Sequence, residues 1–106
     1  MTEMTQRQLR IVLHAPTVGA LARARRNASN LAQEAPDANV HILVNGEAVA
    51  AALDDPDEAL DRVTLVCPNS LKRLGRTAPQ PLTVLQEPGV LALARMQSEG
   101  WQYIRA

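Results

Sequence analysis

The stretch RIVLHA at residues 10–15, closed by Pro16, decides the fold of this chain. It is a near-continuous run of apolar and β-branched residues rather than an alternating one. Such runs are typical of strands that are covered on both faces, as in a parallel sheet. The runs NVHILV at residues 39–44 and RVTLVC at residues 62–67 have the same character. These three runs predict the central strands of a sheet.

Helical patterns separate the predicted strands. In residues 20–35, apolar side chains recur at helical spacing, Thr17 is a candidate N-cap and Pro36 ends the helix. The alternation of strands and helices predicts an α/β sandwich with a mostly parallel sheet and right-handed crossovers. The other predicted elements are helices at residues 47–53, 69–74 and 88–99, and strands at residues 82–85 and 101–104.

The composition narrows the class of protein. The chain has 106 residues, 46% of them hydrophobic and 21% charged, which predicts one folded domain over residues 1–106, with a flexible N-terminal segment at residues 1–9. The eleven basic and eleven acidic residues cancel, and the aromatic residues are one Trp and one Tyr, so we expect no nucleic acid as a partner. Residues 1–10 are polar and no apolar run reaches the length of a membrane span, so we also expect no membrane partner.

The single cysteine, Cys67, bears on the compartment. One cysteine cannot form an intrachain disulfide, which favours a reducing cytoplasm. The expected core is made mainly of Ala, Val and Leu, which bury less area per residue than aromatic side chains. A homo-oligomer would supply additional buried surface.

Polar residues stand where the first three predicted strands end. In an open parallel sheet, ligands bind beyond the carboxyl ends of the strands. His14, Asn45 with Glu47, and Cys67 occupy these ends, so we expect them to open onto one edge of the sheet. Cys67 also directly precedes the predicted helix at residues 69–74, whose amide donors and dipole favour a thiolate over a thiol.

Two interpretations of Cys67 stay open at this point. As a thiolate, it is a candidate catalytic nucleophile and sulfur acceptor, with His14 as a base or charge partner. As an inert residue, it is buried like most free cysteines, and His14 is hydrogen-bonded at a strand terminus. His41 lies within a strand among apolar residues, so we expect it to have a structural role.

The other polar segments carry no recognisable motif. The five glycines form neither a dinucleotide fingerprint nor a phosphate-binding loop, which argues against a nucleotide-binding regulator. The His and Cys residues lack metal-ligand spacing, so we expect no metal and no cofactor. The acidic residues within 54–61 are expected to be solvated, and the basic cluster at residues 23–26 to be solvated or part of an interface.

Several segments together resemble the small DsrE/DsrF-like proteins, over nearly the whole chain from about Arg10. The most specific segment is the terminal one, where PGV and RMQSEGWQYIR resemble the family's "GV…RxQxEGWxYI" signature. The four segments are RNASNL at residues 26–31, VNGEAV at residues 44–49, VCPNSL at residues 66–71, and PGV with RMQSEGWQYIR at residues 88–90 and 95–105.

This resemblance implies a three-layer α/β/α sandwich with a five-stranded, mainly parallel sheet, in a homo-oligomer that is a trimer or a hexamer. It also implies a sulfur-relay role in which Cys67 holds sulfur as a persulfide, between a sulfur donor and an acceptor protein. His14, Asn45, Glu47 and Asn69 would then form the binding site. The alternative is a non-catalytic oligomeric module that binds a ligand or partner, with a structural Cys67. The sequence departs from the family at Pro68, which lacks a backbone donor.

Overall fold

Five strands form one sheet in the order β4-β3-β2-β1-β5, and every neighbouring pair is parallel. The computed structural model describes residues 8–106. The prediction of a mainly parallel five-stranded sheet is confirmed, and the sheet is in fact parallel throughout. The strands are β1 (Arg10–Ala15), β2 (Asn39–Val44), β3 (Thr64–Val66), β4 (Thr83–Val84) and β5 (Gln102–Arg105).

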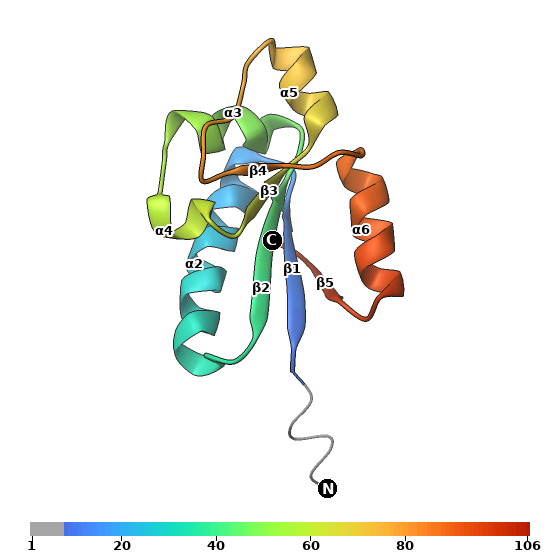
Figure 1. Ribbon diagram of the computed structural model, residues 1–106. Coiled ribbons are helices and arrows are strands. Elements are labelled where there is room, and N and C mark those ends of the chain that lie inside the picture. The colour runs from blue at the N-terminus through green and yellow to red at the C-terminus, as the bar shows by residue number, and fades with distance from the viewer. Residues whose placement is uncertain (1–7) are drawn as a thin grey trace, which may run out of the picture.

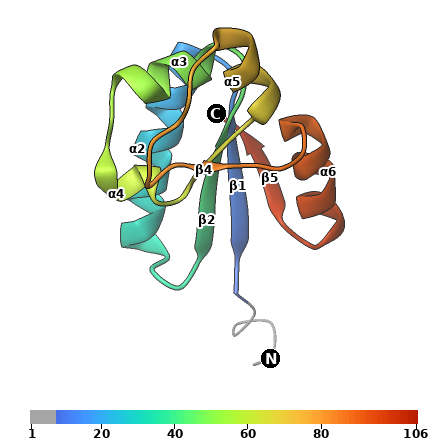
Figure 2. The ribbon, with the colours of Figure 1, turned by 45° about the horizontal axis from the view of Figure 1, so that its top comes forward.

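The helices lie on both sides of this sheet and complete the predicted three-layer α/β/α sandwich. Figures 1 and 2 show α2, α3 and α4 on one face, α6 on the other, and α5 beyond the carboxyl ends of the central strands. The helices are α2 (Val18–Glu34), α3 (Glu47–Asp54), α4 (Glu58–Asp61), α5 (Pro68–Leu74) and α6 (Gly89–Ser98). Helix α4 was not predicted.

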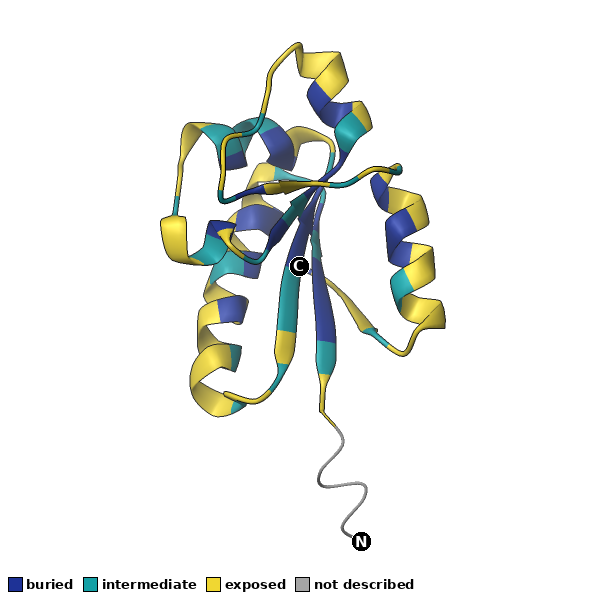
Figure 3. Cartoon of the chain, viewed as in Figure 1, coloured by how far each residue is buried: buried dark blue, intermediate teal, exposed yellow. Residues whose placement is uncertain are grey.

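The two faces of the sheet bury separate apolar clusters, which explains why the strand sequences are continuously apolar. Ile11, Leu13 and Ala15 of β1 pack toward α2, whereas Val12 packs toward α6. The α2 face holds the larger cluster, including the small buried residues of α2 itself. Figure 3 shows the buried core along β1 and β2 and the exposed strand β5.

Local signals in the sequence set the helix boundaries. The Thr17 hydroxyl accepts a hydrogen bond from the Ala20 amide at 3.1 Å, as predicted for an N-cap, so α2 begins at Val18. Helix α5 ends at Leu74, because its C-cap residue Gly75 has a φ of 66°, in the left-handed region that favours glycine. These capping residues can be predicted from the sequence because each contacts only residues within one helical turn of it.

The N-terminal prediction lies mostly outside the structure. Of the flexible segment expected at residues 1–9, residues 1–7 lie outside the described part of the chain. Leu9 is hydrogen-bonded to the first residue of β2, since its carbonyl accepts from the Asn39 amide at 2.8 Å. Within residues 8–106, none of the helices is long and apolar enough to cross a membrane.

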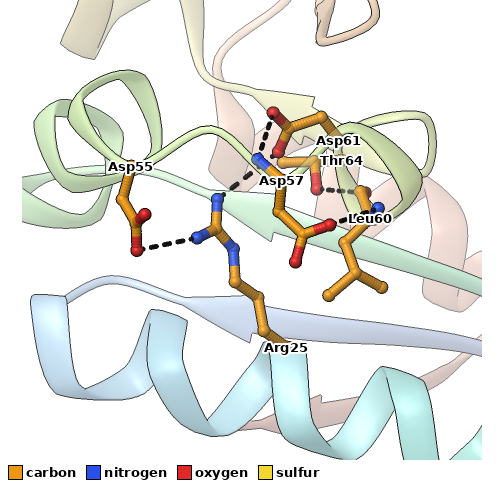
Figure 4. Close-up of polar contacts among 6 residues, drawn as sticks. All are labelled: Arg25, Asp55, Asp57, Leu60, Asp61 and Thr64. Atoms are coloured by element: carbon orange, nitrogen blue, oxygen red, sulfur yellow. Dashed lines mark hydrogen bonds and ion pairs between the residues drawn. The ribbon is translucent and has the colours of Figure 1, made fainter.

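An ion pair between α2 and α4 corrects the prediction that the acidic residues around α4 are all solvated. Asp61 is only 3% exposed, and its carboxylate lies 3.4 Å from the Arg25 guanidinium (Figure 4). The same carboxylate accepts a hydrogen bond from the Asp57 amide at 3.1 Å. The guanidinium also reaches the exposed Asp55 at 3.4 Å. Burial of Asp61 is tolerated because both of its oxygens have partners.

Candidate functional site at the carboxyl edge of the sheet

The carboxyl ends of β1, β2 and β3 lie side by side because these strands are neighbours in the sheet. The ladder continues past the strand ends: the Asn45 amide donates to Ala15 at 3.3 Å, and the Cys67 amide donates to Val44 at 3.0 Å. Because side chains alternate between the faces of a strand, His14, Asn45 and Cys67 all belong to the face that α6 covers. The predicted convergence of these strand ends is therefore present.

Cys67 lies where the first residues of two helices meet. It is the N-cap of α5, and its Sγ accepts a hydrogen bond from the amide of Gly89, the first residue of α6, at 3.3 Å. The residue is 6% exposed, so the sulfur is largely enclosed by these two helix starts. The environment of the thiol is thus set by backbone amides rather than by charged side chains.

These amides decide the state of the thiol. Burial raises the pKa of Cys67, but hydrogen bonds from the Gly89 amide, from the Ser70 amide and hydroxyl, and from the Asn69 amide lower it by more. The net pKa is below the ordinary value of a cysteine. Pro68 has no backbone N–H to donate to the sulfur, but the next two residues, Asn69 and Ser70, donate theirs.

Ser70 connects the cysteine to the turn that follows β2. Its hydroxyl oxygen accepts a hydrogen bond from the Gly46 amide at 2.9 Å. The hydroxyl proton therefore remains available to the sulfur of Cys67, in agreement with its effect on the thiol pKa. Ser70 is 7% exposed, so this bridge lies in the protein interior.

Gly89 is needed at its position because of space. A Cβ at this residue would lie 3.2 Å from Cδ2 of Leu43 and 3.3 Å from Cβ of Cys67. Both distances are tighter than ordinary carbon contacts, so a larger residue would force Leu43, Cys67 or α6 to shift by a few tenths of an ångström. In the sequence, Gly89 belongs to the terminal signature, but no sequence pattern predicts its role beside Cys67.

A second polar group lies along the same edge. The His14 ring lies between two partners, with Nδ1 2.7 Å from Tyr103 Oη and Nε2 2.9 Å from Asn45 Oδ1. The sequence does not predict the contact of Tyr103, on β5, with His14, because the two residues are 89 positions apart along the chain. The only sequence signal was its place in the terminal signature.

The remaining candidates contribute less. Glu47 is exposed at the start of α3, and it is not among the groups that shift the thiol pKa. Asn69 acts on the sulfur through its backbone, and its exposed side chain lines a shallow hollow of about 290 Å³ with Lys72 and Arg73. His41 has the expected structural contacts, since Nδ1 lies 3.1 Å from the Val63 carbonyl oxygen and the ring packs beside Trp101.

Comparisons with known proteins add no assignment. No protein-family model matches the chain, and no curated protein is significantly similar to it. The resemblance to DsrE/DsrF-like proteins therefore stays a prediction from the sequence, and the function is argued from the site itself.

Proposed function

We propose that the protein is a sulfur carrier that holds sulfur as a persulfide on Cys67. The Cys67 thiolate attacks the outer sulfur of a donor persulfide, the donor S–S bond breaks, and the donor leaves as a thiolate. A new S–S bond on Cys67 then holds the sulfur. An acceptor thiolate attacks the same outer sulfur, and the electron pair of the broken bond returns to Sγ. Neither step needs an external oxidant or reductant.

The hydrogen bond from the Gly89 amide to Sγ is the observation that carries this proposal. A thiolate is the nucleophile in exchange and also the leaving group when sulfur is passed on. The hydrogen-bond donors that lower the pKa of the thiol support both roles, since they stabilise the Cys67 thiolate before loading and after release. Lys72 and Arg73, which line a hollow with Asn69, add positive charge to α5, the helix that begins directly after Cys67.

Mass spectrometry tests the proposal directly. The native protein is incubated with a small-molecule persulfide, and the intact mass is compared with that of the Cys67→Ser variant. We expect the native chain to gain one sulfur atom and the variant to gain none. No gain in the native chain, or an equal gain in both proteins, would contradict the proposal.

The burial of Cys67 favours a second candidate function. A cysteine that is 6% exposed and packs against Gly89 suits a non-catalytic module that binds a ligand or partner. Reaction of the native protein with a small thiol reagent separates the two functions. A carrier reacts in the folded state, whereas the binding module reacts only after denaturation.

We further propose that the chain works as a homo-oligomer, a trimer or a hexamer, in the cytoplasm. Exposed apolar side chains support association, and a reducing compartment keeps the lone thiol free. Light scattering tests the assembly, because an 11.5 kDa particle at micromolar concentration would contradict it. The large apolar residues that are exposed are Leu9, Val18, Leu74, Val84, Val90, Leu91, Tyr103 and Ile104.

A further inference from the structure

Strand β5 leaves one edge of the sheet open among the described residues 8–106. It is the last strand in the order β4-β3-β2-β1-β5, and each of its residues is exposed (Figure 3). The open edge of a strand presents unpaired N–H and C=O groups, which act as a template for a strand of another chain. Natural proteins therefore protect such edges with short strands, prolines or charges.

The opposite edge of the sheet has this protection. Strand β4 consists of the two residues Thr83–Val84, and prolines stand close to it on both sides, at positions 81 and 88. Strand β5 has four residues and no proline, and its large apolar side chains, Tyr103 and Ile104, are 39% and 43% exposed. The two edges of the sheet thus differ, and β5 is the one that remains open to pairing.

The register of β5 on β1 shows which backbone groups are free. The Ala106 amide donates to the His14 carbonyl at 2.9 Å, so the backbone N–H of Ala106 points toward β1. Because this direction alternates along a strand, Ile104 also points its backbone groups toward β1, whereas Tyr103 and Arg105 point theirs away. The N–H and C=O groups of Tyr103 and Arg105 therefore form the open edge.

This edge is complementary to itself. Around a two-fold axis perpendicular to the sheet, a second copy of β5 runs antiparallel beside the first. Tyr103 then lies opposite Arg105 of the second copy, and Arg105 lies opposite its Tyr103, so that each pair exchanges both backbone hydrogen bonds. Ile104 faces Ile104 of the second copy between these pairs, in a non-hydrogen-bonded position where the Cα atoms are about 4.5 Å apart. Every free backbone group of Tyr103 and Arg105 has a partner in this register.

The side chains agree with the same register. Ile104 pairs in the sheet with Leu13, which packs toward α2, so Ile104 lies on that face and contact with its copy buries apolar surface. On the other face, Arg105 comes to lie beside the Tyr103 ring of the second copy, which is a favourable cation–π arrangement. His14 already holds the tyrosine hydroxyl at 2.7 Å, so little side-chain freedom is lost on pairing. The formal net charge of zero also favours association of copies.

We propose that β5 is the interface between two copies of this chain, which pair antiparallel around a two-fold axis at Ile104 and join their sheets into one. This inference rests on the homo-oligomer of the proposed function and names the surface that forms it. Of the two proposed assemblies, a hexamer of two stacked trimers contains two-fold axes, whereas a lone trimer does not.

The mass of the particle in light scattering tests the interface. Ile104→Glu places two carboxylates opposite each other and removes the apolar contact, so the two-fold pairing should be lost. Val84→Glu, on β4, is the matched control, because Val84 is 41% exposed on the other edge strand. At a concentration where the native protein is just fully assembled, we expect Ile104→Glu to halve the particle mass and Val84→Glu to leave it unchanged. Circular dichroism confirms that both variants are folded.

Cysteine cross-linking tests the register without weakening the interface. In a Cys67→Ser background, the variants Ile104→Cys, Tyr103→Cys and Gln102→Cys are oxidised mildly and analysed without reductant. We expect a covalent dimer from Ile104→Cys, because residue 104 faces its own copy at a Cα distance that a disulfide spans. The other two variants should stay uncrosslinked, since neither position lies opposite its own copy.

Each failure has a separate meaning. A native protein that is monomeric contradicts the proposed assembly and this inference together. A native assembly whose mass is unchanged by Ile104→Glu leaves the homo-oligomer standing and overturns the β5 interface. Cross-linking through Gln102→Cys or Tyr103→Cys in place of Ile104→Cys overturns the pairing proposed for β5. Sulfur uptake on Cys67 is measured independently, so failure of the carrier function is distinguished from failure of the interface.

Discussion

Replacing the Gly89 amide tests whether it controls the reactivity of Cys67. Glycolic acid at position 89, introduced by semisynthesis, turns this amide into an ester and removes the N–H that donates to Sγ. The ester adds no Cβ, which at this position would lie 3.2 Å from Cδ2 of Leu43. It also adds no atom between residue 89 and Sγ, so the native protein is the matched control for the ester variant.

The size of the effect follows from the lost hydrogen bond. A hydrogen bond to a charged group contributes about 1.5–3 kcal/mol, which is about a ten- to hundredfold change in the acid dissociation constant of the thiol. The thiolate that remains is more nucleophilic, because nucleophilicity rises with pKa at a Brønsted slope of about 0.4–0.5. At pH values below the midpoint of the profile, the rate of alkylation of Cys67 should therefore fall about three- to twelvefold in the ester variant relative to the native protein.

The assay is the rate of alkylation by a small haloacetamide as a function of pH, with both proteins shown to be folded by circular dichroism. We expect the midpoint of the profile to move to higher pH in the ester variant. Equal profiles in the two proteins would refute the reasoning, because the Gly89 amide would then have no influence on the thiolate.

Three further predictions concern the same site and the ion pair between α2 and α4. Ser70→Ala should raise the pKa of Cys67, because the hydroxyl that lowers it is lost, and the alkylation profile would record this as a shift to higher pH. Since the thiol pKa is lowered in the folded protein, the thiolate stabilises the fold above the ordinary pKa, and this contribution is lost as the pH falls through the lowered value. The difference in unfolding free energy between the native protein and Cys67→Ser should therefore rise with pH across that window in urea titrations, and a fall would show that the sign is wrong. Arg25→Ala should destabilise the protein by about 3–5 kcal/mol, because it leaves Asp61 buried and unpaired. Arg62→Ala, which breaks an exposed pair, should cost under about 1 kcal/mol in the same denaturation assay.

The strongest predictions from the sequence were those that depend on neighbouring residues. The bounds of β1 and β2 were predicted correctly, because both strands are apolar on both faces and end at a proline or at Asn45-Gly46. Strand β3 is shorter than its apolar run, since only Thr64–Val66 pair with β2. Helix α4 has four residues, too few to show a helical period.

The site was only partly predictable, because its contacts depend on strand order. The rule that ligands bind at the carboxyl ends of strands brought Cys67, His14 and Asn45 to one edge. It could not show that β5 pairs with β1, which places Tyr103 beside His14. Nor could it show that the first residue of α6, Gly89, lies beside Cys67 and donates its amide hydrogen to Sγ. These contacts join segments far apart in the chain and follow from tertiary packing.

Transfer of labelled sulfur tests the central claim most directly. Cys67 is loaded from a small persulfide that carries a sulfur isotope, the donor is removed, and an acceptor thiol is added. We predict that the label leaves Cys67 and appears on the acceptor as a persulfide, at equal rates and one atom per chain. Label that stays on Cys67, or that leaves as hydrogen sulfide without reaching the acceptor, would contradict the carrier role.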